Sequence, residues 1–102
     1  MNTAIISGNL TADIDEREIN DKSLCKFTVA CNQGEQAVFM PIEAWNMAHL
    51  PKYLHKGSKV LLQGFLKQEN WETDAKERRS KIVLVCHKVD FLDPAPKKNA
   101  AR

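Results

Sequence analysis

The sequence contains no long hydrophobic segment. Its longest strictly apolar runs are short ones such as Val60–Leu62 and Ile82–Cys86, far below the roughly 20 residues that cross a bilayer. The first residues have no basic stretch ahead of an apolar one, so no secretory signal is visible. We therefore expect a cytoplasmic protein without a membrane span.

The sequence also carries little excess charge. Its 102 residues have a formal net charge of +2, although 27% of them are charged, and this balance excludes a bulk polycation. Residues 1–35 hold six acidic and three basic residues, whereas residues 36–102 hold seven acidic and twelve basic ones. With 43% apolar residues, we expect one globular domain whose near-neutral total hides a basic face.

Cysteines are few and lack a pairing pattern. Cys25, Cys31 and Cys86 are an odd number without a CxxC spacing, which argues against a disulfide framework and against a zinc site. We interpret them as small buried apolar residues.

No catalytic motif is present. The sequence has no Walker loop and no GxGxxG, HExxH or GxSxG motif, and its three histidines are scattered. Asp13, Asp15 and Glu16 are interpreted as a solvated acidic loop rather than a cation site. We therefore predict that the protein is not an enzyme and has neither a cofactor nor a bound metal.

The sequence does contain period-two alternation, which predicts strands. The five predicted strands are Thr3–Thr11, Leu24–Cys31, Ala37–Trp45, Lys59–Leu66 and Lys81–Leu92. The polar segment Ala12–Asp21 is interpreted as a strand end with a turn at Asn20-Asp21. Lys67–Ser80 is interpreted as a charged loop.

A single helix is predicted at Asn46–Lys56, from the helical spacing of its apolar residues and from Asn46 as an N-cap. Pro51 marks a point at which this helix starts or bends. Three strands, a helix and two strands do not make a doubly wound sheet. They fit an all-β OB-fold, which is a five-stranded Greek-key barrel with the helix between strands three and four. Gly8 and Gly64 suit a small barrel, whose strands bend sharply to close.

The third predicted strand has two aromatic residues on one face. Phe39 and Trp45 have the parity opposite to the apolar set Val38, Met40, Ile42 and Ala44. If that set fills the barrel, the two aromatics project outward. Outward aromatics can stack on unpaired bases; the alternative is that they pack under a loop or in an oligomer interface.

Trp71 lies in the charged segment with few apolar neighbours. The basic residues that follow it include Lys76, Arg78 and Arg79. Their side chains can contact successive phosphates of a nucleic-acid backbone. The alternatives are that Trp71 caps the barrel end and that the bases form a solvated turn.

Several segments resemble the bacterial single-stranded DNA-binding protein family, and the resemblance covers roughly residues 2–92. One is the opening Ile-x-x-Gly-Asn-Leu pattern that ends at Leu10. Another is the Tyr-Leu-x-Lys-Gly-Ser-x-Val run Tyr53–Val60, followed by Gly-x-Leu at Gly64. The resemblance implies an OB-fold that binds single-stranded DNA without strong sequence preference, in replication, recombination or repair.

The resemblance also implies roles for single residues. Phe39 and Trp45 match stacking positions on the third strand, and Trp71 matches a stacking tryptophan after the fourth. Lys56 and Lys67 match basic positions near the bound strand. Together with the basic residues that follow Trp71, the predicted DNA-binding residues are Phe39, Trp45, Lys56, Lys67, Trp71, Lys76, Arg78 and Arg79.

The sequence departs from the family pattern at three places. The turn Asn32–Gln36 is very short where the family has a long basic loop, Glu69 stands where a base is expected, and the acidic C-terminal tip is missing. Primosomal replication protein N, a short relative that binds single strands and partner proteins in replication restart, is therefore the alternative. A third possibility is a barrel kept only as a protein-interaction module.

We expect the OB domain at residues 1–92 and a disordered basic tail at residues 93–102. The resemblance further implies a homo-oligomer, with a tetramer favoured over a dimer, and replication or primosome proteins as candidate partners.

Overall fold

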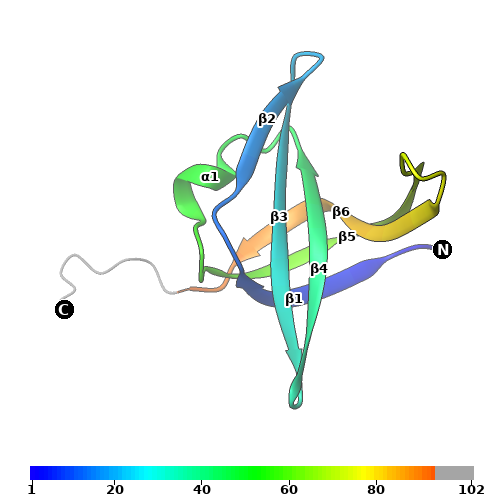
Figure 1. Cartoon of the computed structure of the whole chain (residues 1–102). Coiled ribbons are helices and arrows are strands. Elements are labelled where there is room, and N and C mark those ends of the chain that lie inside the picture. Colours follow the sequence, from blue (N-terminus) through cyan, green and yellow to red (C-terminus); the bar gives the residue numbers. More distant parts are fainter. Residues whose placement is uncertain (94–102) are drawn as a thin grey trace, which may run out of the picture.

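The computed structural model describes residues 1–93 and shows a barrel of strands with a short helix at its side (Figure 1). Its elements are β1 (Ala4–Leu10), β2 (Asp15–Ile19), β3 (Lys22–Gln33), β4 (Gln36–Trp45), α1 (Leu50–Tyr53), β5 (Lys59–Glu72) and β6 (Arg78–Phe91). Apart from its first residue, the tail predicted to be disordered lies outside the described residues. Within residues 1–93, no helix is long and apolar enough to cross a membrane.

The strands close into a ring. The sheet has the order β1-β5-β6-β4-β3-β2, and β1 also pairs with β3 through Asn9 and Leu10. The ring β1-β3-β4-β6-β5 is therefore complete, with β4 and β6 parallel and its other pairs antiparallel. This confirms the predicted five-stranded OB barrel with the helix between its third and fourth strands. β2 extends the sheet beyond this ring as a partner of β3.

Strand alternation fills the inside of the barrel with apolar side chains. Ile42, Leu62 and Leu84 are fully enclosed there. Cys25 and Cys86 are buried with free thiols, as predicted, whereas Cys31 is only partly buried. Burial raises the pKa of Cys25 and of Cys86. A buried thiol with a raised pKa is a poor nucleophile, so these cysteines serve packing.

β5 and β6 form a longer hairpin than the sequence predicted. We expected strands at Lys59–Leu66 and Lys81–Leu92 with a charged loop between them, but the pairing continues out to Glu72 and Arg78. The outer part of the hairpin is polar on both faces, so it has no hydrophobic alternation to mark it. Trp71 therefore lies on a strand, and its assignment to a loop is wrong.

The predicted helix at Asn46–Lys56 is wrong in length. α1 has four residues, with Pro51 in its first turn, because proline can start a helix but cannot lie further along it. Asn46 is not the N-cap. It has a left-handed φ of 59°, and its N–H donates to the carbonyl of Ser23 at 2.7 Å. α1 buries Leu50 against the core.

We predicted that Val38, Met40, Ile42 and Ala44 of β4 face the inside of the barrel. This prediction is correct from Met40 onward and wrong for Val38. Ile42 and Ala44 are buried and Met40 packs against the core, but Val38 is 51% exposed. The β3–β4 hairpin runs past the end of the barrel (Figure 1), so Val38 has no opposite wall to pack against.

The two predicted turns are confirmed. Asn20 and Asp21 join β2 to β3 with φ values of 52° and 66°, the positive pair that a type I′ hairpin turn requires. Gly34 has a φ of 64° in the tight turn between β3 and β4.

Gly64 allows β5 and β6 to approach closely. A Cβ atom at Gly64 would overlap the carbonyl oxygen of Val85, and the pairing register shifts between Gln63 and Gly64. Gly8 lies in the same way against the carbonyl oxygen of Ala30, beside the point where β1 closes on β3. The sequence predicted sharp bends at these two glycines, and the structure shows that at each of them another strand's backbone approaches too closely for a Cβ atom.

We expect Gly64→Ala to lower the free energy of unfolding by about 3 kcal/mol, because the β6 backbone must move to admit the methyl group. Gly34→Ala is the control. A Cβ at Gly34 meets no atom within 4 Å, so that change adds only left-handed strain of about 1 kcal/mol. Urea denaturation of both variants measures the difference, and equal losses would contradict the close approach at Gly64.

Candidate nucleic-acid interface

One face of the β5–β6 hairpin carries a row of aromatic and charged side chains. Lys67, Glu69 and Trp71 share one face of β5, because strand residues alternate. Their partners across the ladder on β6 are, in order, Val83, Lys81 and Arg79. The row therefore runs from a tryptophan opposite an arginine, near the hairpin tip, to lysines and a glutamate nearer the barrel.

Trp71 is exposed despite its size. Its exposed fraction is 47%, and it borders an open hollow of about 650 Å³ that Arg78 and Arg79 also line. The structure thus brings together an aromatic residue and two basic residues that were predicted from the sequence to bind DNA. A flat ring next to cations suits a nucleotide, which has a planar base and an anionic phosphate.

Lys76 lies at the hairpin tip with a left-handed φ of 62°. The N–H of Thr73 donates to the carbonyl of Glu77 at 2.9 Å, and the N–H of Lys76 donates to the carbonyl of Thr73 at 2.8 Å. Arg79 donates to the Glu77 carboxylate at 2.8 Å, with both side chains exposed. Exposed ion pairs of this kind contribute little, so an incoming phosphate can compete for Arg79.

β4 carries the other two predicted aromatics at separate points. Phe39 is 62% exposed near the β3–β4 turn. Trp45 ends the strand, is half-buried, and borders a hollow of about 400 Å³ together with Ile19, Asn20 and Lys22. A spacing of six residue steps along the strand places the two residues about 20 Å apart, so each would contact a different nucleotide.

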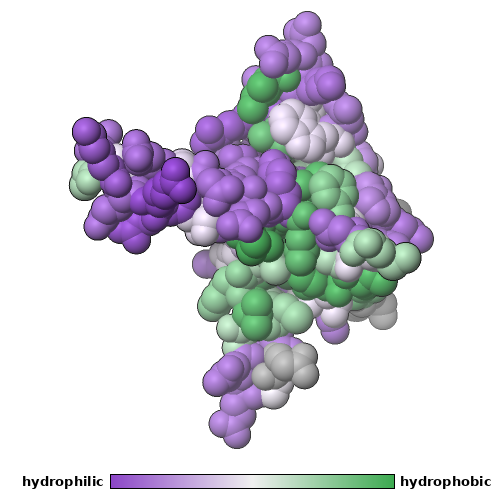
Figure 2. Space-filling model, turned by 90° about the vertical axis from the view of Figure 1, so that its right-hand side faces the viewer, coloured by the Kyte–Doolittle hydropathy of each residue, from purple (hydrophilic) through white to green (hydrophobic). Residues whose placement is uncertain are grey.

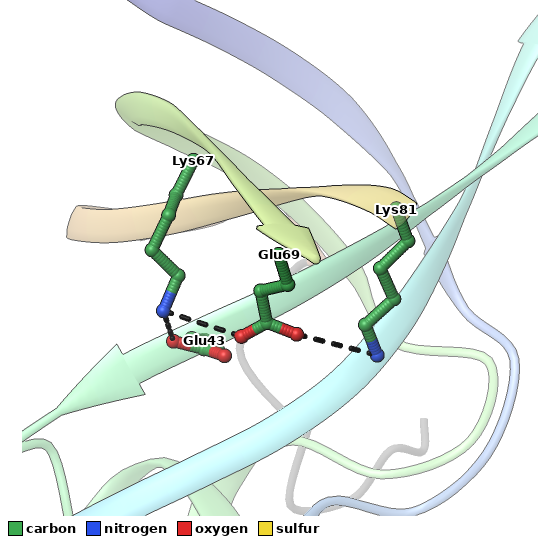
Figure 3. Close-up of polar contacts among 4 residues, drawn as sticks. All are labelled: Glu43, Lys67, Glu69 and Lys81. Atoms are coloured by element: carbon green, nitrogen blue, oxygen red, sulfur yellow. Dashed lines mark hydrogen bonds and ion pairs between the residues drawn. The ribbon is translucent and has the colours of Figure 1, made fainter. Parts of the chain in front are cut away.

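Glu43 lies between them on the same side of β4 and is buried, with an exposed fraction of 5%. Lys67 Nζ reaches across from β5 and donates to Glu43 Oε1 at 3.0 Å. The same ammonium lies 3.3 Å from Glu69 Oε2, and Lys81 Nζ lies 3.8 Å from Glu69 Oε1 (Figure 3). These four residues, which we call the ion network, join the hairpin face to the face of β4.

The ion network shifts pKa values in the directions that keep its groups charged. Hydrogen bonds to Glu43 and to Glu69 raise the pKa of the Lys67 ammonium. The Lys67 ammonium, which lies 3.3 Å from Glu69 Oε2, lowers the pKa of the Glu69 carboxyl, and the charge of Lys81 acts in the same direction. Lys67 and Glu69 are therefore both ionised at neutral pH.

A smaller hollow of about 180 Å³ lies where the hairpin meets the barrel. Its lining includes Lys26, Pro41, Glu43 and Lys81. Lys26 of β3 is the register partner of Glu43, so β3, β5 and β6 each place a lysine around this part of the face. The predicted site residue Lys67 thus lies among basic side chains but already has carboxylate partners.

Figure 2 shows the molecule from the side to which the β5–β6 hairpin projects. Hydrophilic side chains dominate the upper and left-hand projections and reach into the centre, and hydrophobic side chains lie to the right of the centre and below it. The large apolar residues that the described chain leaves exposed include Val38, Phe39 and Trp71. A face on which apolar and charged side chains lie next to each other suits a ligand that has flat rings and a charged backbone.

Lys56 does not join this face. It lies in the loop between α1 and β5, where its backbone N–H donates to Asp13 Oδ1 at 2.8 Å. That loop leads into β5, whereas Trp71 lies near the other end of the strand (Figure 1). The structure therefore brings no other predicted site residue to Lys56, and its role stays a prediction.

Comparison with known proteins identifies the family. The model of the single-strand binding protein family matches residues 1–92. The chain belongs to this family. The single-stranded DNA-binding proteins of Helicobacter hepaticus and Wolinella succinogenes are each 30% identical to it, over 93% and 90% of this chain and 63% and 64% of their own lengths. That of Onion yellows phytoplasma is 30% identical over 91% of this chain and 95% of its own length.

The chain thus spans slightly less than two thirds of the first two relatives and nearly all of the third. The family match covers each of the six strands and the helix.

Three charged residues of this face were not predicted from the sequence: Lys26, Glu43 and Lys81. Each stands on the outward side of a strand, where a charge is ordinarily solvated, so alternation does not distinguish it from other surface charges. The sequence contained one signal for Glu43: it lies between Phe39 and Trp45 and, by strand alternation, on the same face of the strand as these two aromatics.

We expect Lys67→Met to lower the free energy of unfolding by about 1–2 kcal/mol. Methionine keeps the apolar stem but leaves the Glu43 carboxylate buried without its cation. The loss is smaller than for a fully enclosed pair, because the Lys67 side chain is 41% exposed.

The double variant Lys67→Met, Glu43→Gln removes the uncompensated charge as well, and it should regain at least half of the loss. Chemical denaturation of both variants is the measurement. A double variant as unstable as Lys67→Met alone would mean that the ion network does not hold the hairpin to β4.

Proposed function

We propose that this protein binds single-stranded DNA in a sequence-tolerant way, without catalysis, by stacking bases on aromatic side chains and neutralising phosphates with lysine and arginine. The observation that carries the proposal is Trp71, exposed on a strand with Arg79 directly across the ladder. Family membership supports the same function. A cytoplasmic protein in replication, recombination or repair, with replication or primosome proteins as partners, is part of this proposal.

The arrangement of the aromatics supports a single strand as the ligand. Trp71 belongs to the hairpin face and Phe39 and Trp45 to β4, and the Lys67–Glu43 contact joins the two surfaces. Every base has a flat face, so stacking does not depend on base identity. In a duplex the bases already stack on one another, and separated rings such as these have no free base face to contact.

Nothing in this mechanism needs a cofactor. Within residues 1–93, no group of three or more histidine, cysteine or carboxylate side chains is placed to hold a metal ion.

The test of this function is a titration with oligo-dT and with a duplex of equal length, followed by tryptophan fluorescence. We expect oligo-dT to bind much more tightly than the duplex, with log Kd rising against log salt concentration by about 0.7 for each phosphate neutralised. Equal affinity for the duplex would contradict the proposal. Binding of neither would leave the barrel as a protein-interaction module.

A variant with Lys76, Arg78 and Arg79 all changed to alanine is the control for the electrostatic part. It should reduce the salt slope by up to about 2 and keep the fluorescence change that stacking causes.

We also propose that the protein forms a homo-oligomer, with a tetramer favoured over a dimer. β1 pairs with β5 along one edge, whereas its other edge meets β3 only at Asn9 and Leu10. The remaining backbone of that edge, beside the exposed Ile5, is open to a second copy of the chain. Light scattering at micromolar concentration measures the mass, and a monomer would contradict this part of the proposal.

The two tryptophans should separate binding from folding. We expect Trp71→Ala to weaken binding of oligo-dT by about 1–3 kcal/mol and to leave the melting temperature nearly unchanged, because this side chain is exposed. Trp45→Ala should weaken binding similarly and also lower the melting temperature, because Trp45 is half-buried beside the β2–β3 turn. Binding isotherms and thermal melts measure both effects. A Trp71→Ala protein that binds as the parent does would make Trp71 a structural residue.

A further inference from the structure

The middle of the proposed binding face is occupied by the protein's own counter-charges. Lys67 Nζ and Lys81 Nζ both lie beside the Glu69 carboxylate, at 3.3 and 3.8 Å, and Lys67 is also 3.0 Å from Glu43 (Figure 3). A phosphate that arrives there meets two cations that already have anionic partners.

We propose that Glu69 competes with the DNA backbone for Lys67 and Lys81, so that a phosphate binds there only by displacing the Glu69 carboxylate. The inference rests on the proposed single-strand binding and concerns what sets the affinity of that same site.

Glu69 is the partner that can move. Its side chain is 30% exposed, compared with 6% for Glu43, and its contacts are longer than the Lys67–Glu43 contact. The Glu43 side chain is enclosed between its own strand, β4, and the hairpin. It therefore stays in contact with Lys67 when the Glu69 carboxylate leaves. Since Lys67 and Lys81 already reach the two oxygens of one carboxylate, they can also reach two oxygens of one phosphate.

Displacement of Glu69 changes the salt dependence of binding. A phosphate that binds a free lysine releases about 0.7 cation from a single strand. When the phosphate displaces Glu69 instead, the freed carboxylate attracts a cation from solution, and this uptake offsets the release. The protein should therefore show a shallower salt dependence than the lysines on its face imply.

Displacement also couples binding to protons. The charged groups that face Glu69 are Lys67 on its own strand, Lys81 from β6, Glu43 from β4 and, beyond Glu43, Lys26 from β3. In the free protein, the two contacting lysines favour the ionised carboxyl. In the complex they face phosphate and Glu69 lies beside an anion, so it binds a proton more readily. Binding then takes up protons, and affinity rises as the pH falls through the pKa that Glu69 has in the complex, towards its lower pKa in the free protein.

The test is Glu69→Gln, which keeps the size of the side chain and removes its charge. In titrations with oligo-dT, we expect about three- to tenfold tighter binding at pH 7 in 0.1 M salt and a slope against log salt steeper by about 0.7. The gain in affinity on acidification should be smaller in the variant. Thymine does not titrate in this range, and the contribution of the histidines cancels in the comparison with the parent.

Asp90→Asn is the matched control, because it makes the same change in net charge at the other end of β6, on an exposed residue. Its slope should equal that of the parent. If Glu69→Gln and Asp90→Asn change binding equally, the effect is one of total charge and the inference is overturned.

A Glu69→Gln protein with the slope and pH profile of the parent also overturns the inference while leaving single-strand binding intact. If the parent does not bind oligo-dT, the proposed function itself fails, and the inference fails with it. Thermal melts confirm that the variant is folded; if it is not, Glu69→Ala removes the same charge and must show the same changes.

Discussion

The rest of the structure depends on the close approach of β5 and β6 at Gly64. Because Gly64 has no Cβ, the carbonyl of Val85 lies against its backbone at the point where the pairing of β5 with β1 ends and its pairing with β6 continues outward. The pairing register shifts at the same point, and a shift of this kind bends and twists a strand pair. The bend at Gly64 therefore sets the direction in which the outer hairpin leaves the barrel (Figure 1).

That direction decides which side chains meet on the outside of the barrel. Beyond Gly64, Lys67 and Glu69 reach the outward face of β4 and cover Glu43. Glu43 is thus buried by a second strand pair and not by the core. Burial of a carboxylate is unfavourable without a partner, and the contact with Lys67 offsets that cost. The ion network therefore depends on the direction that the β5–β6 hairpin takes beyond Gly64.

The sequence predicted the barrel because each of its strands has one face in the core, which leaves an alternating pattern. The prediction failed where that condition is absent. The outer part of the β5–β6 hairpin has no face in the apolar core, and Val38 lies beyond the barrel end. The helix at Asn46–Lys56 was predicted from apolar spacing, but Pro51 prevents a helix from starting well before it, and the backbone is already extended at Leu54. Large outward aromatics stood out in the sequence, whereas the burial of Glu43 depends on a hairpin whose path the sequence does not specify.

A face whose central charges are already paired must obtain its affinity from other interactions. Stacking contributes about 1–3 kcal/mol for each base and is little affected by salt, whereas attraction between exposed charges is screened within about 10 Å at 0.1 M salt. Arg79 and Lys76, near the hairpin tip, are exposed, while Lys67 is held by Glu43 and Glu69. In the proposed complex, Arg79 can exchange its exposed partner Glu77 for a phosphate beside Trp71 more easily than Lys67 can leave the buried Glu43. Along β4, where the lysines are neutralised, binding depends on the rings of Phe39 and Trp45.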